Sequence, residues 1–250
     1  REWRVLADKV LGDSFLSSNA KFATNPKRVA NRHETDAIVA AGGTVVLSET
    51  EEIVGAEDLL AARATDENVK ADLLRIVALS EESVRRGSSN ASGIYITPGN
   101  VEGGLTTIAE KSLGCIRKGG TAPLVEVVAT AQRPSKKGFV VMDTSFYDTY
   151  SVTSKVAGGV SIVLFTTGRG TPAGNPIVPV IKVSSNTPLF QKMGDDIDID
   201  AGTIVAGAES IAQVGGRILD LVGEVASGKE TKAEAWGWRY QEFGIGLAAP

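Results

Sequence analysis

Residues 160–170 read Val-Ser-Ile-Val-Leu-Phe-Thr-Thr-Gly-Arg-Gly, a mostly apolar run followed by a polar, glycine-rich loop. A short, β-branched apolar run bounded by turn residues is typical of a strand buried on both faces. The same order of apolar run and polar end occurs at residues 44–50 and 138–144. We therefore expect strands over residues 44–47, 138–142 and 160–165.

Helical patterns alternate with these runs along the chain. Asn25 and Pro26 are typical of a helix start, and Gly42-Gly43 ends that helix. The other expected helices cover residues 55–63, 66–86, 104–117, 150–157, 187–193 and 208–226, and the other expected strands cover residues 123–128 and 178–183. This order predicts an α/β fold, with a mostly parallel sheet covered by helices on both faces in a Rossmann-like three-layer arrangement.

Polar residues follow three of the expected strands. They are Ser48-Glu49-Thr50, Asp143-Thr144 and Thr166-Thr167-Gly168-Arg169. Ligands of parallel sheets collect just beyond the carboxyl ends of the strands. The sequence therefore predicts that these segments converge at one edge of the sheet and form a site.

The composition excludes several classes of function. The 250 residues have a net charge of −4 and no long basic stripe, so we expect no nucleic-acid partner. The longest apolar runs are far shorter than the ~20 residues that a membrane-spanning helix needs. With one cysteine, Cys115, and one histidine, His33, an internal disulfide and a Cys/His zinc cage are excluded. The N-terminus does not resemble a signal peptide, and we expect a cytoplasmic protein.

A second glycine-rich segment begins with the turn Pro98-Gly99-Asn100 and continues through Gly103-Gly104 into an expected helix. The first turns of that helix carry Thr106, Glu110 and Lys111. Backbone amides, small hydroxyls and an adjacent acid–base pair suit a small, oxygen-rich anion. Asn100 and Thr106 are candidates to donate hydrogen bonds to substrate hydroxyls, although Pro-Gly-Asn is also a common turn.

These residues carry a resemblance to a known family. The chain resembles the altronate/galactarate dehydratases over roughly residues 25–250. The sulfolactate sulfo-lyase large subunits belong to the same superfamily. The similar segments are Ser48-Glu49-Thr50, Pro98-Gly99-Asn100, Gly103-Gly104-Leu105-Thr106, Glu110-Lys111-Ser112-Leu113-Gly114, residues 165–172 and residues 199–203. The resemblance implies a hydro-lyase that removes water from a galactarate- or altronate-type sugar acid to give a 2-keto-3-deoxy acid. It also implies a divalent metal, usually Fe²⁺, with Mn²⁺ or Mg²⁺ as alternatives.

The resemblance also bears on the organisation of the chain. Residues 25–250 resemble the C-terminal α/β region of such an enzyme, and residues 1–24 are interpreted as a divergent segment at the cut edge of a longer chain. The family's Cys-Gly-Gly-Ser-Asp-type segment is replaced by Leu11-Gly12-Asp13-Ser14. We expect the missing N-terminal region or a small subunit as a partner, and a homo-oligomer. The alternatives are a sulfo-lyase that acts on sulfolactate, or a non-catalytic half.

Dehydration next to a carboxylate needs a base, a cation that stabilises the enediolate, and an acid for the departing hydroxyl. Lys111 is the candidate base if burial lowers its pKa, and Glu110 would bind metal or orient the lysine. Two solvated charges on a helix are the alternative for this pair. Lys182, inside an expected strand, is a second candidate base, or else a solubilising lysine on an edge strand.

The remaining candidates would bind the substrate and the metal. Arg169 would hold the substrate carboxylate in two hydrogen bonds, or else pair with a nearby acid and fix its loop. Thr166 and Thr167 would bind the carboxylate through backbone amides, or simply end a strand. Glu49 and Asp143 offer the oxygen ligands that hard cations prefer, or else cap helices.

Overall fold

The structure is a computed structural model, and it describes residues 15–19, 27–87 and 108–237. Within these ranges only the backbone is described for residues 15–19, 27–33, 84–87, 108 and 110. No helix in the described residues is both long enough and apolar enough to cross a membrane.

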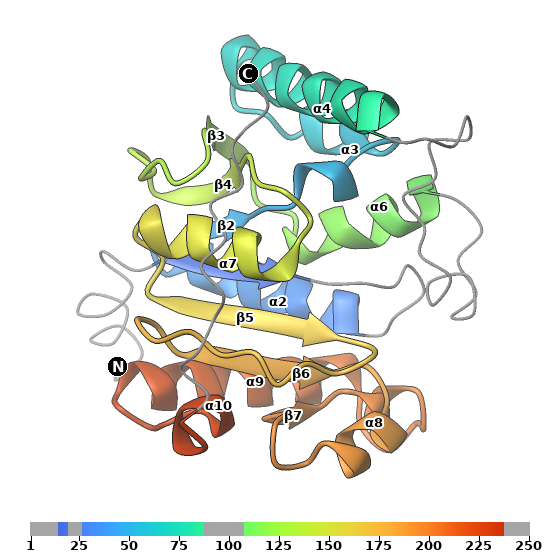
Figure 1. The fold of residues 1–250 in the computed structure, drawn as a ribbon, viewed down its shortest axis with the longest axis vertical. Helices are drawn as coiled ribbons and strands as arrows, with labels where there is room; N and C mark the ends of the chain where they lie inside the picture. The colour runs from blue at the N-terminus through green and yellow to red at the C-terminus, as the bar shows by residue number, and fades with distance from the viewer. Residues whose placement is uncertain (1–14, 20–26, 88–107, 238–250) are drawn as a thin grey trace.

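The described strands form one parallel sheet (Figure 1). They are β1 Phe15–Asn19, β2 Thr44–Leu47, β3 Leu124–Val128, β4 Gly138–Met142, β5 Ile162–Thr167, β6 Val180–Ser184 and β7 Ile199–Asp200. Their order across the sheet is β3-β4-β2-β1-β5-β6-β7. The sheet thus consists of two three-strand halves, β3-β4-β2 and β5-β6-β7, which β1 joins by pairing with β2 on one side and β5 on the other.

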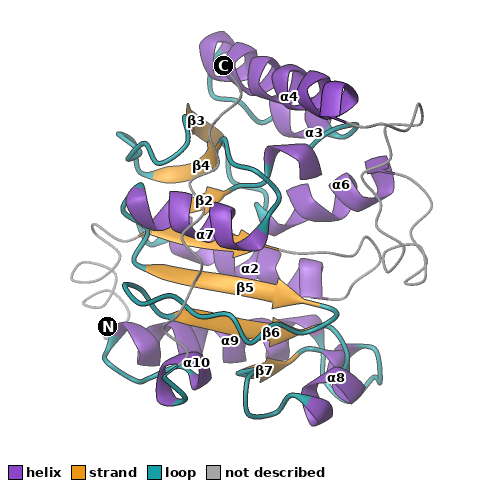
Figure 2. Ribbon diagram, in the orientation of Figure 1, coloured by secondary structure: helices purple, strands orange, loops and turns teal. Residues whose placement is uncertain are grey.

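Helices surround this sheet (Figure 2). They are α2 Lys27–Ala40, α3 Glu57–Ala61, α4 Glu67–Gly87, α6 Ile108–Lys118, α7 Asp148–Ala157, α8 Thr187–Lys192, α9 Ile211–Ala226 and α10 Lys232–Ala235, with the short 3₁₀ helices η2 Thr50–Glu52 and η3 Gly202–Ile204. In Figure 1, α7 crosses in front of the sheet, and α2 and α9 lie behind it. The expected α/β fold with parallel strands and helices is confirmed.

The strands are apolar on both faces because side chains on each face pack in a hydrophobic core. Along β2, Val46 packs in the core beneath α7 with Val152, while Val45 packs on the opposite face in the core of α9. Leu47, on the same face as Val45, joins the core formed with α3, α4 and α6. Cys115 of α6 is a fully buried member of that core, as a small apolar side chain would be.

The structure differs from the sequence-based expectation at several strands. β1 was not predicted, because only the first two of its five residues, Phe15 and Leu16, are apolar. β5 runs two residues further than expected, so Thr166 and Thr167 belong to the strand and not to the loop. β6 lies between β5 and β7, and Lys182 within it is fully buried. The edge-strand interpretation of Lys182 is therefore wrong.

Candidate functional site

The ends of β2 and β4 are joined by a network of hydrogen bonds. The backbone N–H of Thr50 donates to the carbonyl of Thr144 (3.0 Å), and the N–H of Glu49 donates to Thr144 Oγ1 (2.9 Å). Thr50 Oγ1 in turn donates to Asp143 Oδ1 (2.5 Å). Two of the three polar strand ends predicted to converge therefore touch, because parallel neighbours end at the same edge of the sheet.

Glu49 occupies an unusual position at this junction. Its φ of 72° places it in the left-handed region, which costs a residue with a side chain about 1 kcal/mol or more. The side chain is buried, and its Oε1 has no hydrogen-bond partner among the described residues. Burial raises the pKa of Glu49 well above its usual range, and the neighbouring charge of Glu52 adds to this, against the opposing effects of Lys118 and Lys155. Such strained, desolvated groups are typical of functional sites.

Lys111 forms a buried ion pair next to Glu49. Its Nζ lies 2.8 Å from Glu52 Oε1, and Lys118 Nζ lies 3.9 Å from Glu52 Oε2. Burial by itself would lower the pKa of Lys111, but the charge and hydrogen bond of Glu52 outweigh it, so the pKa is raised. The condition for a base, a pKa lowered by burial, is therefore not met by Lys111 in this structure. The alternative of a solvated side chain is wrong for Lys111.

A third buried lysine, Lys155 of α7, reaches the end of β2 from the other face of the sheet. Its Nζ donates to Ser48 Oγ (2.9 Å), and Ser48 Oγ lies 3.1 Å from Ser151 Oγ. Burial lowers the pKa of Lys155 to about 8, and Lys118 contributes in the same direction. Lys155 and Ser151 were not predicted from the sequence. Their spacing of four residues puts them on one face of a helix, but nothing local shows that this face is buried.

We refer to Ser48, Glu49, Glu52, Lys111, Lys118, Ser151 and Lys155 as the Lys–Glu cluster. All seven side chains are buried. With every group ionised, the three lysines exceed the two glutamates by one positive charge. A raised pKa at Glu49 increases that excess, whereas the negative charge of Asp148, which acts on both Glu49 and Lys155, opposes it.

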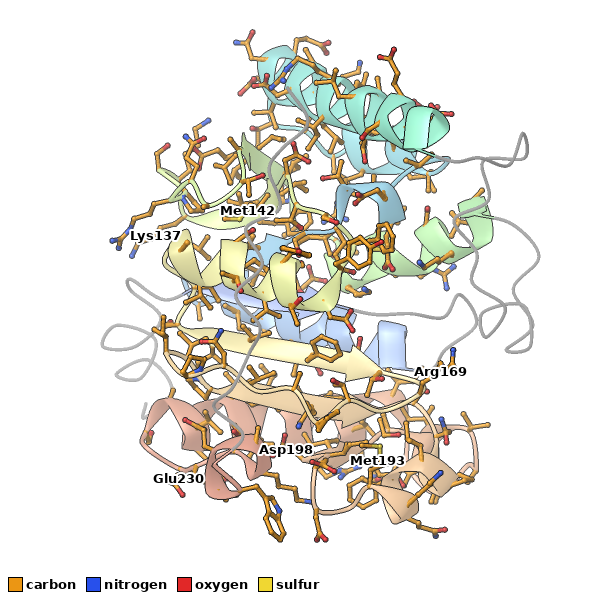
Figure 3. All side chains as sticks on the ribbon, viewed as in Figure 1. Lys137, Met142, Arg169, Met193, Asp198 and Glu230 are labelled. Carbon is orange, nitrogen blue, oxygen red and sulfur yellow. The ribbon has the colours of Figure 1, made fainter. Side chains whose placement is uncertain are left out.

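Thr166, Thr167 and Arg169 lie at the end of β5, which β1 separates from β2. Thr167 Oγ1 accepts hydrogen bonds from the backbone N–H groups of Arg169 (3.3 Å) and Gly170 (2.9 Å), and this fixes the start of the loop. Arg169 is exposed, just beyond the arrowhead of β5 (Figure 3). Its guanidinium makes no ion pair with any residue that the structure describes, so it is available to a ligand.

Lys182 stands apart from the Lys–Glu cluster. It lies in the middle of β6, and its backbone N–H donates to Asp198 Oδ2 (2.7 Å), on the β7 side of the sheet (Figure 3). Its Nζ is buried without a hydrogen-bond partner in the described part of the chain. Burial lowers the pKa of Lys182, against the opposing charges of Asp196 and Asp198. The lowered pKa of Lys182 is the property expected of a catalytic base. Its acidic neighbours are Asp196 and Asp198, whereas Lys111 pairs with Glu52.

Several candidate residues remain outside what the structure describes. Asn100 and Thr106 fall between residues 88 and 107, and the side chain of Glu110 is not described. The two candidate metal ligands, Glu49 and Asp143, do lie at one junction, but Asp143 Oδ1 accepts a hydrogen bond from Thr50 Oγ1. Within the described ranges, no three His, Cys, Asp or Glu side chains are placed to hold a metal ion.

A family model, D-galactarate/altronate dehydratase, C-terminal, matches residues 22–247 of the sequence. The chain belongs to this family. The match confirms the resemblance inferred from the loops and strand ends, and it includes the whole Lys–Glu cluster.

Curated relatives agree with the family assignment. The chain is 40% identical to a galactarate dehydratase (L-threo-forming) of Escherichia coli over 242 residues, which are 96% of this chain and 46% of the relative. It is 35% identical to an altronate dehydratase of the same species, over 79% of this chain and 39% of the relative. It is 38% identical to a (2R)-sulfolactate sulfo-lyase subunit beta of Chromohalobacter salexigens, over 62% of this chain and 40% of the relative.

The family member described here therefore spans less than half the length of these relatives. Its described residues nevertheless contain the central parallel sheet and a buried cluster of charges at the strand ends.

Proposed function

We propose that this chain is the C-terminal region of a hydro-lyase that removes water from a galactarate- or altronate-type sugar acid. The product would be a 2-keto-3-deoxy acid, formed after a base takes the proton next to the carboxylate. The observation that carries the proposal is the 40% identity to a galactarate dehydratase over 96% of the chain. The position of the Lys–Glu cluster, at the sheet edge where parallel folds bind ligands, supports it.

We assign the substrate carboxylate to Arg169, aided by the backbone of Thr166 and Thr167. The guanidinium is exposed, makes no ion pair within the described residues and stands on a loop that Thr167 fixes. A planar guanidinium binds both oxygens of a carboxylate. Asn100 and Thr106 would bind substrate hydroxyls.

The lysines receive roles that follow from their charge. Lys111 is held as an ammonium by Glu52, so it would stabilise negative charge on the substrate or protonate the departing hydroxyl. Lys182, whose pKa is lowered, remains a candidate base, and Glu110 remains a candidate partner of Lys111. We propose these roles from the direction of the pKa shifts of Lys111 and Lys182 together with the family match.

A divalent cation, Fe²⁺ or alternatively Mn²⁺ or Mg²⁺, would stabilise the enediolate when bound. Glu49 offers a buried carboxylate oxygen without a hydrogen-bond partner among the described residues, and Asp143 lies at the same junction. Two carboxylates do not complete a metal site, so further ligands would come from outside the described residues. We derive no step of the reaction through the metal.

Two alternatives remain part of the proposal. The 38% identity to a sulfo-lyase subunit beta favours sulfolactate as the alternative substrate. The coverage of only 46% of the galactarate dehydratase favours a site that needs a further region or a small subunit. We also propose a Rossmann-like three-layer arrangement, a homo-oligomer and a cytoplasmic location. The arrangement is supported by α7 on one face of the sheet and α2 and α9 on the other (Figure 1).

A thermal-shift titration tests the proposed function. The purified chain is titrated with Fe²⁺, Mn²⁺ and Mg²⁺, each with and without galactarate, altronate and sulfolactate. A ligand that binds the folded state raises the melting temperature according to its concentration relative to Kd. We expect a metal-dependent rise with one sugar acid that is lost in Arg169→Ala and kept in Arg75→Ala, an exposed arginine of α4.

The other outcomes discriminate between the alternatives. A rise with sulfolactate alone would identify the sulfo-lyase activity. No rise with any pair would contradict a complete site in these 250 residues and favour the non-catalytic half. We expect the isolated chain to show little turnover, so dehydration at about 1 per second or faster would contradict that expectation.

A further inference from the structure

We propose that Asn186, between β6 and α8, is a positioning residue of the substrate site, because it holds the loop that presents Arg169. The proposal rests on the proposed function, in which Arg169 binds the substrate carboxylate. It concerns the junction where the ends of β5 and β6 meet the start of α8. In the order of the sheet, this junction lies on the far side of β1 from the Lys–Glu cluster.

The side-chain amide of Asn186 makes one hydrogen bond as acceptor and another as donor. Its Oδ1 accepts from the backbone N–H of Leu189 (2.8 Å), which makes Asn186 the N-cap of α8. Its Nδ2 donates to the carbonyl of Gly168 (3.1 Å), in the loop after β5. Aspartate and serine cap helices about as well as asparagine does. Only asparagine carries the acceptor and an amide donor on separate atoms, so the bond to Gly168 accounts for this residue type.

Asn186 is itself held in place by the ends of two further strands. Ser184, the fully buried last residue of β6, donates from its Oγ to the carbonyl of Asn186 (2.8 Å). Gly202, just after β7, lies so close to the backbone of Asn186 and Thr187 that a Cβ would not fit there. The donor that reaches Gly168 therefore comes from a fixed part of the backbone.

Other contacts hold the rest of the loop but leave its arginine open. Thr167 Oγ1 accepts from the backbone N–H groups of Arg169 (3.3 Å) and Gly170 (2.9 Å). Gly170 has a φ of 86°, and a Cβ on it would meet the sulfur of Met193, just after α8 (Figure 3). The guanidinium of Arg169 is exposed and makes no ion pair within the described ranges. The backbone of the loop is thus fixed, while its charged side chain is free to contact a ligand.

A fixed loop favours binding because ordering it on binding would cost free energy. Without the bond to Asn186, the carbonyl of Gly168 loses its link to the end of β6. We therefore expect weaker binding of the carboxylate by Arg169, with the fold intact. The loss of one such hydrogen bond corresponds to about a 5- to 10-fold change in affinity.

The first test uses Asn186→Ser in the complete enzyme that contains this chain, with the sugar acid that it dehydrates. Serine keeps a capping oxygen for α8, removes the amide donor and adds no charge near Arg169. KM should rise about 5- to 10-fold and kcat should change by less than about threefold, because the arginine binds the carboxylate before and during the reaction. In Arg169→Ala, the same substitution should leave KM unchanged, because Asn186 acts through Arg169. An equal rise of KM in both backgrounds would overturn the proposal.

The matched control is Thr231→Val, which removes a helix cap elsewhere. Thr231 is the N-cap of α10, and its Oγ1 accepts from the backbone N–H of Glu234 (3.4 Å). In Figure 1, α10 and α8 lie towards opposite sides of the view. Thr231→Val should lower the melting temperature and leave KM unchanged. If it raised KM as much as Asn186→Ser does, loss of a cap would explain the effect and the proposal would be wrong.

The second test measures amide hydrogen exchange in this chain by NMR and needs no activity. The N–H groups of Arg169 and Gly170 should exchange about 5-fold faster or more in Asn186→Ser and at the wild-type rate in Thr231→Val. Unchanged exchange, or an unchanged KM, in Asn186→Ser would refute the role of Asn186 while the dehydratase activity stands. Absence of lyase activity towards galactarate, altronate and sulfolactate in the wild-type enzyme would refute the proposed function, and the exchange rates would still decide whether Asn186 holds the loop.

Discussion

Replacing Glu34 by glutamine should stabilise the protein at neutral pH. Glu34 lies on α2 and is only 2% exposed, and neither carboxyl oxygen has a hydrogen-bond partner among the described residues. Burial raises its pKa from 4.5 to about 9, and an interaction with its own backbone N–H offsets only part of this. The native fold therefore keeps this side chain as a neutral acid.

The size of the effect follows from that pKa. Between pH 4.5 and about 9 the folded protein holds a proton on Glu34 that the unfolded chain releases, so stability falls as the pH rises through this window. Each pKa unit corresponds to about 1.4 kcal/mol. The buried carboxyl therefore lowers the free energy of unfolding by less than about 1 kcal/mol at pH 5, by about 3 kcal/mol at pH 7 and by about 5 kcal/mol at pH 8. Glutamine is neutral at every pH and does not incur this cost.

Urea unfolding at pH 5, 7 and 8 measures the prediction. The free energy of unfolding of Glu34→Gln should exceed that of the wild type by an amount that grows with pH. Glu230→Gln is the control, because Glu230 is exposed (Figure 3), and it should stay within about 0.5 kcal/mol of the wild type. If Glu34→Gln raised the free energy of unfolding equally at all three pH values, or lowered it at pH 8, the reasoning would be refuted.

Three further predictions follow from the packing and the site. Lys111→Met should lower the free energy of unfolding by about 3–5 kcal/mol, because it leaves Glu52 buried with its closest cation removed; urea unfolding that changes by less than 1 kcal/mol would contradict this. Gly202→Ala should destabilise by about 2 kcal/mol or more, since a Cβ there meets the backbone of Asn186 and Thr187. Gly216→Ala in α9, where a Cβ meets nothing, should be neutral or stabilising in the same assay. Arg169→Lys should leave the melting temperature of the free protein unchanged but reduce sugar-acid affinity about 10-fold, which a thermal-shift titration detects.

The sequence by itself determined the local elements and the sheet edge at which the candidate site lies. Apolar runs such as 44–47 and 138–142 are strands because alternate residues pack on opposite faces of a covered sheet, and this pattern is local. The same rule placed Glu49 and Asp143 at one edge, since parallel neighbours end together. The loop motifs also led to the correct family.

Only the tertiary structure decided the centre of the sheet and the ionisation of the cluster. β1 is central although only two of its residues are apolar, because it pairs with strands that are distant in sequence. Lys155 meets Ser48 across 107 positions, and Lys111 keeps its charge because Glu52 lies 2.8 Å from it. The pKa of a buried lysine depends on how far burial is offset by such partners, and the partners come from separate elements that only folding brings together.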